Sequence, residues 1–146
     1  MKASSSQLVV LDTTVIVHLA RDSPTGRAIE TQYALTSRSE RPLLSTVVEG
    51  EILALARGWG WGQTKMAQLN ALLLELVRVD AGMREIVQAY AELYYEATRS
   101  GKPRGENDLW IAATAQATGG ALFTRDTDFA WMHPDFLAVC CIPEVR

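Results

Sequence analysis

Two short apolar runs, each closely followed by an aspartate, constrain the fold of this chain more than any other feature. The run Gln7 to Leu11 is apolar after its first residue and ends at Asp12, and the run Ala121 to Thr124 is followed by Asp126. Apolar runs of this length are typical of strands buried on both faces of a parallel sheet. We therefore predict that both aspartates lie at the carboxyl edge of such a sheet, where open α/β folds bind ligands.

The rest of the chain alternates between short strands and helices. A helix that begins near Asp108 carries apolar residues at helical spacing and ends at Gly119 and Gly120. Further strands are expected at 42–45, 77–79 and 137–142, and further helices at 15–20, 26–40, 46–57, 63–77 and 83–99. This alternation predicts an α/β fold, a three-layer α/β/α sandwich with a short parallel sheet. At 146 residues, we expect one domain spanning 1–146.

Composition excludes some classes of protein and leaves others open. Charged residues make up 21% and hydrophobic residues 48%, with no apolar run of membrane-spanning length, so we expect a soluble, cytoplasmic protein without a membrane partner. Cys140 and Cys141 are neighbours whose side chains would point to opposite faces of a strand, which argues against a disulfide or a metal knuckle. A net charge of −3 argues against general nucleic-acid binding, unless clustered acids hold divalent cations.

The acidic residues suggest a reason for such a cluster. Asp12, Asp108, Asp126 and one acid of the helix at 46–57 would converge at one edge of the sheet. Helical periodicity does not decide whether Glu49 or Glu51 is that acid. Carboxylates at such close range repel one another, and a hard divalent cation relieves the repulsion. Oxygen ligands without histidine or cysteine favour Mg²⁺ or Mn²⁺, and such sites suit phosphodiester hydrolysis.

Three other features each allow two interpretations. Trp59 and Trp61 alternate with glycines and either form a hydrophobic corner between two helices or stack on bases or a protein partner. The basic residues of the loop before Asp108 either hold a phosphate backbone or form a solvated helix end. His18 has no second metal-type partner at ligand spacing, so we interpret it as a partly buried structural residue. The basic residues of the loop before Asp108 are Arg99, Lys102 and Arg104.

Four segments together resemble the PIN-domain ribonucleases, and especially the VapC-type toxins of bacterial toxin-antitoxin pairs. They are LVVLDTTVIVHL, LLSTVVEGEILALA, GENDLWIAATA and ALFTRDTDF, and they occur in that family's order and spacing across nearly the whole chain. The resemblance implies a PIN-like fold and a metal-dependent endoribonuclease that leaves a 5′-phosphate and a 3′-hydroxyl. It also implies a homodimer that is silenced by a cognate antitoxin protein.

The resemblance assigns roles residue by residue. It makes Asp12 and Asp108 the main metal ligands, with Glu51 and Asp126 completing a catalytic site of four carboxylates. By the same matching, Glu49 becomes a residue of the solvent face.

Three further positions of the motif are informative. Thr124 matches a hydroxyl that supports the carboxylates, and Asp128 is a second candidate for the fourth acid. Thr14 is a departure, because many members of the family carry asparagine there, and this difference bears on substrate positioning rather than on metal binding.

Two other functions compete with the nuclease. A phosphatase of the haloacid dehalogenase type also begins with a strand that ends in aspartate, but its chemistry needs an acid two residues later, where this chain has Thr14. A catalytically silent PIN-like module would bind RNA or protein without cutting it. All four acids are present, so nothing in the sequence indicates inactivity.

Overall fold

A five-stranded parallel sheet forms the centre of the molecule. The computed structural model describes residues 7–143, and its strands run in the order β3-β2-β1-β4-β5 with every neighbouring pair parallel. The predicted parallel sheet is therefore confirmed. The strands are β1 (Val9–Leu11), β2 (Leu43–Ser45), β3 (Val77–Val79), β4 (Ala121–Thr124) and β5 (Val139–Cys141).

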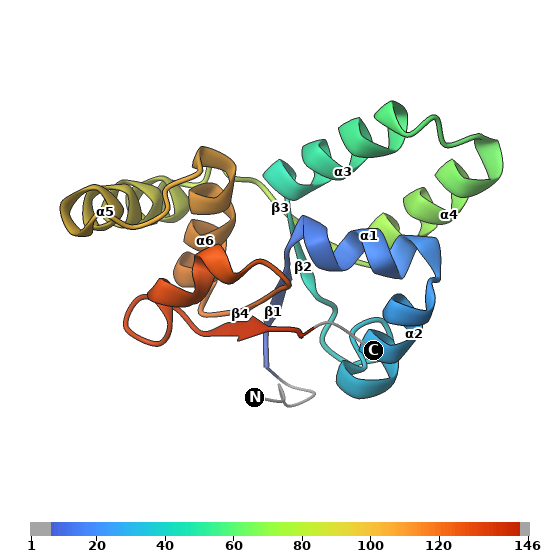
Figure 1. Cartoon of the computed structure of the whole chain (residues 1–146), viewed down its shortest axis with the longest axis horizontal. Helices are drawn as coiled ribbons and strands as arrows, with labels where there is room; N and C mark the ends of the chain where they lie inside the picture. The colour runs from blue at the N-terminus through green and yellow to red at the C-terminus, as the bar shows by residue number, and fades with distance from the viewer. Residues whose placement is uncertain (1–6, 144–146) are drawn as a thin grey trace.

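Helices cover both faces of the sheet and complete the predicted three layers. Helices α1 to α4 lie on one side and α5 and α6 on the other (Figure 1). Their bounds are α1 (Thr13–Arg21), α2 (Pro24–Tyr33), α3 (Thr46–Gly58), α4 (Gln63–Leu74), α5 (Arg84–Ser100) and α6 (Glu106–Thr118), with a 3-10 helix η1 (Thr127–Met132) after β4. Within residues 7–143, no helix is long and apolar enough to cross a membrane.

Helix α2 is shorter than predicted. It begins at Pro24, where the Ser23 hydroxyl accepts the Gly26 N–H, and ends at Tyr33 instead of continuing to residue 40. The next residue, Ala34, has a left-handed backbone with φ of 51°, and its N–H bonds to the Glu30 carbonyl. A residue in this conformation ends an α-helix, so the prediction for residues 34–40 was wrong.

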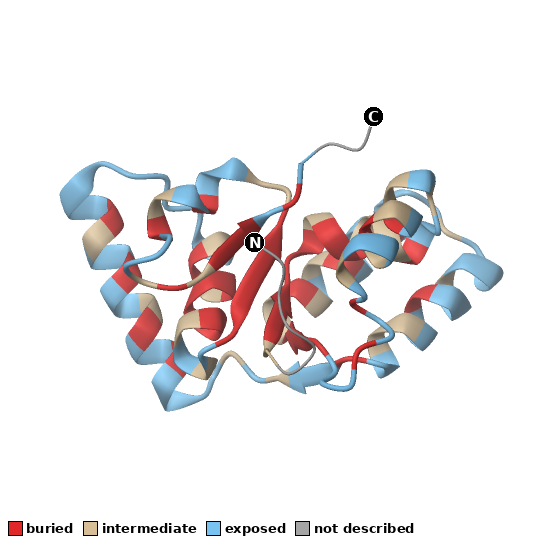
Figure 2. Cartoon of the chain, turned by 90° about the horizontal axis from the view of Figure 1, so that it is seen from below, coloured by how far each residue is buried: buried red, intermediate tan, exposed pale blue. Residues whose placement is uncertain are grey.

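The core follows the central strands. Every residue of β1, β2 and β4 is buried (Figure 2), as expected for parallel strands covered on both faces. Cys140 is buried and Cys141 is exposed, and neither forms a disulfide with another described residue. The two cysteines therefore lie on opposite faces of β5, as predicted.

The topology creates a crevice at one edge of the sheet. The chain leaves β1 through α1 on one face, and it enters the neighbouring strand β4 from α6 on the other face (Figure 1). Adjacent strands whose connections run to opposite faces leave an opening beyond their carboxyl ends, which is where open α/β sheets bind ligands. Asp12 and Asp126 follow these two strands, so both side chains belong to this edge.

Candidate metal centre

Asp12 is the most enclosed acid at this edge. It pairs in register beside β4, because its N–H donates to the Phe123 carbonyl at 3.0 Å, and it is only 4% exposed. One carboxylate oxygen accepts the Thr13 N–H at 2.8 Å, which caps helix α1. The other oxygen accepts hydroxyls from Thr124 at 2.7 Å and Thr14 at 2.9 Å.

The two threonines connect Asp12 to the segment after β4. The Thr124 hydroxyl also accepts the Asp126 N–H at 2.9 Å, and the Thr14 hydroxyl accepts the Arg125 N–H at 3.0 Å. Thr14 therefore supports both the Asp12 carboxylate and the backbone at Arg125. A carboxylate has roughly four acceptor positions, so three donors leave Asp12 about one for a further partner.

Three other acids lie close to one another and are more exposed than Asp12. One carboxylate oxygen from each of Asp108, Asp126 and Asp128 lies within 4.8 Å of the others. Asp108 comes from the first turn of α6, and Asp126 caps η1 by accepting the Asp128 N–H at 2.9 Å. Asp128 is exposed, whereas the other two are half-buried. The structure thus brings Asp128, a secondary candidate in the sequence, into direct company with two primary ones.

Helix α3 separates its two candidate acids. Glu51 approaches α1, where its carboxylate lies 3.4 Å from the Thr13 hydroxyl. Glu49 instead forms an ion pair with Arg78 of β3 at 3.0 Å. Of the two, only Glu51 therefore lies on the side of Asp12, and its role as a metal ligand stays a prediction. Glu49 is half-buried in its ion pair with Arg78, so it is not the solvent-face residue that the resemblance implies.

Burial, with repulsion between neighbouring acids adding to it, raises the pKa values of Asp12, Glu51 and Asp108. Burial is the largest cause of the raised pKa of Asp108, which reaches about 6, and the charges of the four other acids, Asp12, Glu51, Asp126 and Asp128, add to it. Burial also raises the pKa of Asp12 and of Glu51, and hydrogen bonds partly oppose both shifts. Within the part of the chain that the structure describes, no ion pair joins any of these five acids to a basic side chain.

This donor set fits a hard divalent cation. It consists of carboxylate oxygens with threonine hydroxyls behind them, and among residues 7–143 no histidine or cysteine belongs to the tight group. Oxygen-only sets of this kind suit Mg²⁺ and Mn²⁺. A cation would also offset the burial and the repulsion that together raise the pKa of Asp108.

Comparison with known proteins identifies the fold family. Residues 9–132, which make up most of the chain, match the PIN domain family. The chain belongs to the PIN domain family. Among curated relatives of this PIN domain, the VapC ribonuclease Y4jK of Sinorhizobium fredii is 32% identical over 82% of this chain and 88% of the relative. Ribonuclease VapC1 of Haemophilus influenzae is 28% identical over 85% of this chain and 96% of the relative.

Solved structures agree on the fold. The PIN domain superposes on a chain of VapBC2 from Rickettsia felis, solved bound to a promoter DNA fragment, with a TM-score of 0.77 and 21% identity. That match covers 92% of this chain and 98% of the other. A chain of VapBC-1 from nontypeable Haemophilus influenzae gives a TM-score of 0.70 at 23% identity, over 92% of this chain and 97% of the other. The predicted family and fold are thereby confirmed.

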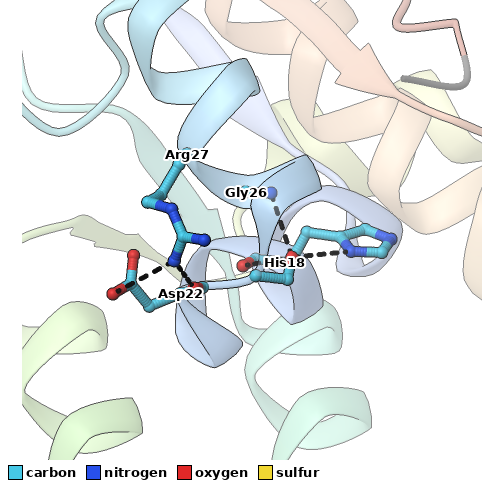
Figure 3. Close-up of polar contacts among 5 residues, drawn as sticks. His18, Asp22, Gly26 and Arg27 are labelled. Atoms are coloured by element: carbon cyan, nitrogen blue, oxygen red, sulfur yellow. Dashed lines mark hydrogen bonds and ion pairs between the residues drawn. The ribbon is translucent and has the colours of Figure 1, made fainter. Parts of the chain in front are cut away.

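The sequence did not reveal a contact between His18 and Arg125. The His18 Nε2 atom lies 2.7 Å from Arg125 Nη1, although the two residues are 107 positions apart. His18 lies near the α1–α2 junction, beside Gly26 (Figure 3). Its ring nitrogen Nδ1 lies 3.4 Å from the Ser23 hydroxyl, which also accepts the Gly26 N–H at 3.0 Å. A Cβ atom on Gly26 would lie 2.1 Å from the His18 carbonyl oxygen, so only glycine permits this close approach. His18 is structural, as predicted, and it also positions an arginine of this PIN domain.

The structure also shows the surroundings of the two glycine-flanked tryptophans and of the basic loop before Asp108. Trp61 packs against the hydrophobic core, whereas Trp59 is 43% exposed, so only Trp61 matches the predicted corner. In the basic loop, Arg99 pairs with Glu96 at 2.6 Å and Arg104 bonds to the Thr98 hydroxyl at 2.9 Å. These contacts favour the interpretation of that loop as a solvated helix end.

Proposed function

We propose that this PIN domain is a Mg²⁺-dependent endoribonuclease, with Mn²⁺ as an alternative ion, and the toxin component of a toxin-antitoxin pair. One observation carries the proposal: carboxylate oxygens of Asp108, Asp126 and Asp128 lie within 4.8 Å of one another, and among residues 7–143 no ion pair joins them to a basic side chain. A bare cluster of this kind costs free energy in the absence of a cation. The curated VapC ribonucleases among its relatives support RNA as the substrate.

In this proposal, Asp12, Glu51, Asp108 and Asp126 are the catalytic carboxylates and hold the metal, and Asp128 is a fifth candidate ligand. When bound, a divalent cation supplies Lewis-acid activation of water and neutralises charge at the scissile phosphate. The chain itself contributes orientation. Thr124 and Thr14 fix the Asp12 carboxylate, and the α6 backbone at Gly105 approaches the Asp108 carboxylate closely enough that a side chain there would crowd it.

We also propose an antitoxin partner, self-association and a cytoplasmic location. The similar structures from Rickettsia felis and Haemophilus influenzae are VapBC assemblies, which supports a partner for this chain. On α3 and α4, the exposed apolar side chains of Leu53 and Leu74 line one pocket that a protein partner or a second copy would cover. Two cysteines that form no disulfide among the described residues support a reducing compartment.

RNA cleavage by purified, antitoxin-free protein tests the enzyme. A structured RNA pool is incubated with Mg²⁺, Mn²⁺ or EDTA, and wild type is compared with Asp12→Asn and Asp108→Asn. Asp22→Asn is the matched control, because Asp22 is exposed at the far end of α1 in a left-handed conformation that asparagine tolerates. We expect cutting that requires metal, disappears in both site variants and persists in the control. If a folded wild-type sample cuts no RNA with either ion, the silent binding module is the better description.

A further inference from the structure

A cavity opens beside the carboxylates and has no role in the metal centre. Its volume is about 830 Å³, within the range of about 300–1,000 Å³ that is usual for small-ligand sites. Thr14 and Thr127 border it on the side of the acids, since Thr14 bonds to Asp12 and Thr127 lies between Asp126 and Asp128. A ligand in this cavity would therefore lie next to a phosphate held at the metal centre.

Arg125 supplies positive charge to the cavity wall. Its guanidinium donates to His18 Nε2 at 2.7 Å, which requires the neutral imidazole as acceptor. Burial and the nearby arginines lower the pKa of His18, so the neutral form is favoured. Among the described residues, no carboxylate pairs with Arg125, and its Nε atom is buried without a hydrogen-bond partner. The guanidinium is thus oriented but its charge is not neutralised.

Trp59 supplies an aromatic surface to the same cavity. Its side chain is 43% exposed and carries the Arg21 guanidinium 4.4 Å from the ring centroid. Arg21 also forms no ion pair with any residue from 7 to 143. Unneutralised arginines beside an exposed indole are the combination that single-stranded nucleic acids recognise.

We propose that this cavity is a subsite for one nucleotide of single-stranded RNA, whose phosphate contacts Arg125 and whose base stacks on Trp59. The inference rests on the proposed ribonuclease function and extends it to substrate recognition. A chain of net charge −3 with a cluster of acids repels a phosphate polymer. The positive charges of Arg125 and Arg21 reduce this repulsion at the cavity. Flexible single-stranded RNA suits the site, since only unpaired bases are free to stack on a side chain.

Binding measured without cleavage tests the subsite. A labelled single-stranded RNA oligonucleotide is titrated with protein in EDTA, over a series of salt concentrations, and followed by fluorescence anisotropy. The variants are Arg125→Met, Arg125→Lys, Trp59→Ala and Trp59→Phe. The controls are Arg41→Met and Tyr95→Ala. Arg41 is exposed and precedes the amino end of β2, and Tyr95 is an exposed aromatic residue on α5. Thermal unfolding of each variant verifies that it is folded.

The two residues have different expected signatures. Arg125→Met should weaken binding and reduce the slope of log K against log salt by about 0.7, the value for one phosphate contact on a single strand. Arg125→Lys should restore that slope. Trp59→Ala should weaken binding about tenfold or more with the slope unchanged, as expected for a lost stacking contact, and Trp59→Phe should recover part of the affinity. Both controls should bind as wild type.

Cys141 provides a second measurement that needs no substitution. It is exposed and lines the cavity, whereas its neighbour Cys140 is buried. Bound RNA should slow alkylation of Cys141 by iodoacetamide, with Cys140 as the internal reference, and a polyanion that lacks bases should protect it less.

The outcomes separate the subsite from the enzyme. Affinity that depends on Arg125 and Trp59, together with protection of Cys141, supports the subsite even if no RNA is cleaved, in which case only the enzyme proposal fails. Cleavage by wild type with an unchanged KM in both variants overturns the subsite and leaves the nuclease intact. Equal RNA binding by wild type and both variants also overturns it, and a protein partner then becomes the better occupant.

Discussion

Asp12 and Asp108 stand at the same edge of the sheet, but their surroundings differ. Asp12 is buried and accepts three hydrogen bonds from the chain itself. Asp108 is half-buried, and burial together with the charges of neighbouring acids raises its pKa to about 6. The fold therefore holds one half of the site in place without help, whereas the other half is under repulsion until a cation arrives. The following experiments probe this difference.

Cation binding should stabilise the protein through the Asp108 side. Mg²⁺ at about 100 times its Kd should raise the free energy of unfolding by about 2.7 kcal/mol, because only the folded chain presents the site. Asp108→Asn should remove most of this gain. The measurement is thermal unfolding in Mg²⁺ against EDTA, with Asp22→Asn as the control. A stabilisation of equal size in Asp108→Asn would mean that the ion binds elsewhere.

Removing one hydroxyl should weaken the Asp12 side. Thr124→Val keeps the shape of a fully buried side chain but removes a donor to Asp12 and the acceptor for the Asp126 N–H. We expect the free energy of unfolding to fall by about 1.5–3 kcal/mol, the usual range for hydrogen bonds to charged groups. Chemical denaturation measures the loss, and Thr124→Ser, which retains the hydroxyl, should recover much of it. If Thr124→Val left the free energy of unfolding unchanged, the hydrogen bond from Thr124 to Asp12 would contribute nothing to stability.

The pH dependence of stability should expose the repulsion around Asp108. Its pKa is raised in the folded state to about 6 from an ordinary value of 3.8, so the stability that it contributes is full below about pH 4 and is lost as pH rises through 6. In EDTA, wild type should therefore lose more stability than Asp108→Asn between pH 5 and 7. The comparison with the variant cancels the opposite effect of His18, whose pKa is lowered. Parallel pH profiles for the two proteins would contradict the raised pKa.

The smallest effect is expected at the outermost acid. Asp128 is exposed and Asp126 is half-buried and caps η1, so Asp126→Asn should reduce RNA cleavage about tenfold more than Asp128→Asn. Initial rates at saturating Mg²⁺ decide between them. The reverse order would make Asp128 the fourth catalytic carboxylate.

The sequence predicted the parts of this arrangement that depend on local pattern. Buried apolar runs located β1 and β4, and the aspartates after them followed from the parallel topology. Helical periodicity did not separate Glu49 from Glu51, because that choice depends on which neighbouring element each side chain meets: Arg78 for one and Thr13 for the other.

Other features depend on contacts between distant residues or on a single backbone conformation. The pairing of Arg125 with His18 joins residues on two elements and has no local signal. The early end of α2 rests on the left-handed backbone of Ala34, a conformation for which alanine gives no warning. The assignment of catalytic roles to the acids, and of one domain to 1–146, stays a prediction; residues 1–6 and 144–146 lie outside the described part of the chain.

The pairing of β1 with β4 also determines when the site forms during synthesis. The hydrogen bond from Thr124 to Asp12 spans 112 positions, and Asp108, Asp126 and Asp128 all come late in the chain. An unfinished polypeptide still attached to the ribosome therefore carries Asp12 and Glu51 but lacks the strand and the acids that complete the group. A chain released before Asp128 has no assembled carboxylate cluster, so the proposed nuclease activity would be confined to molecules translated beyond that residue.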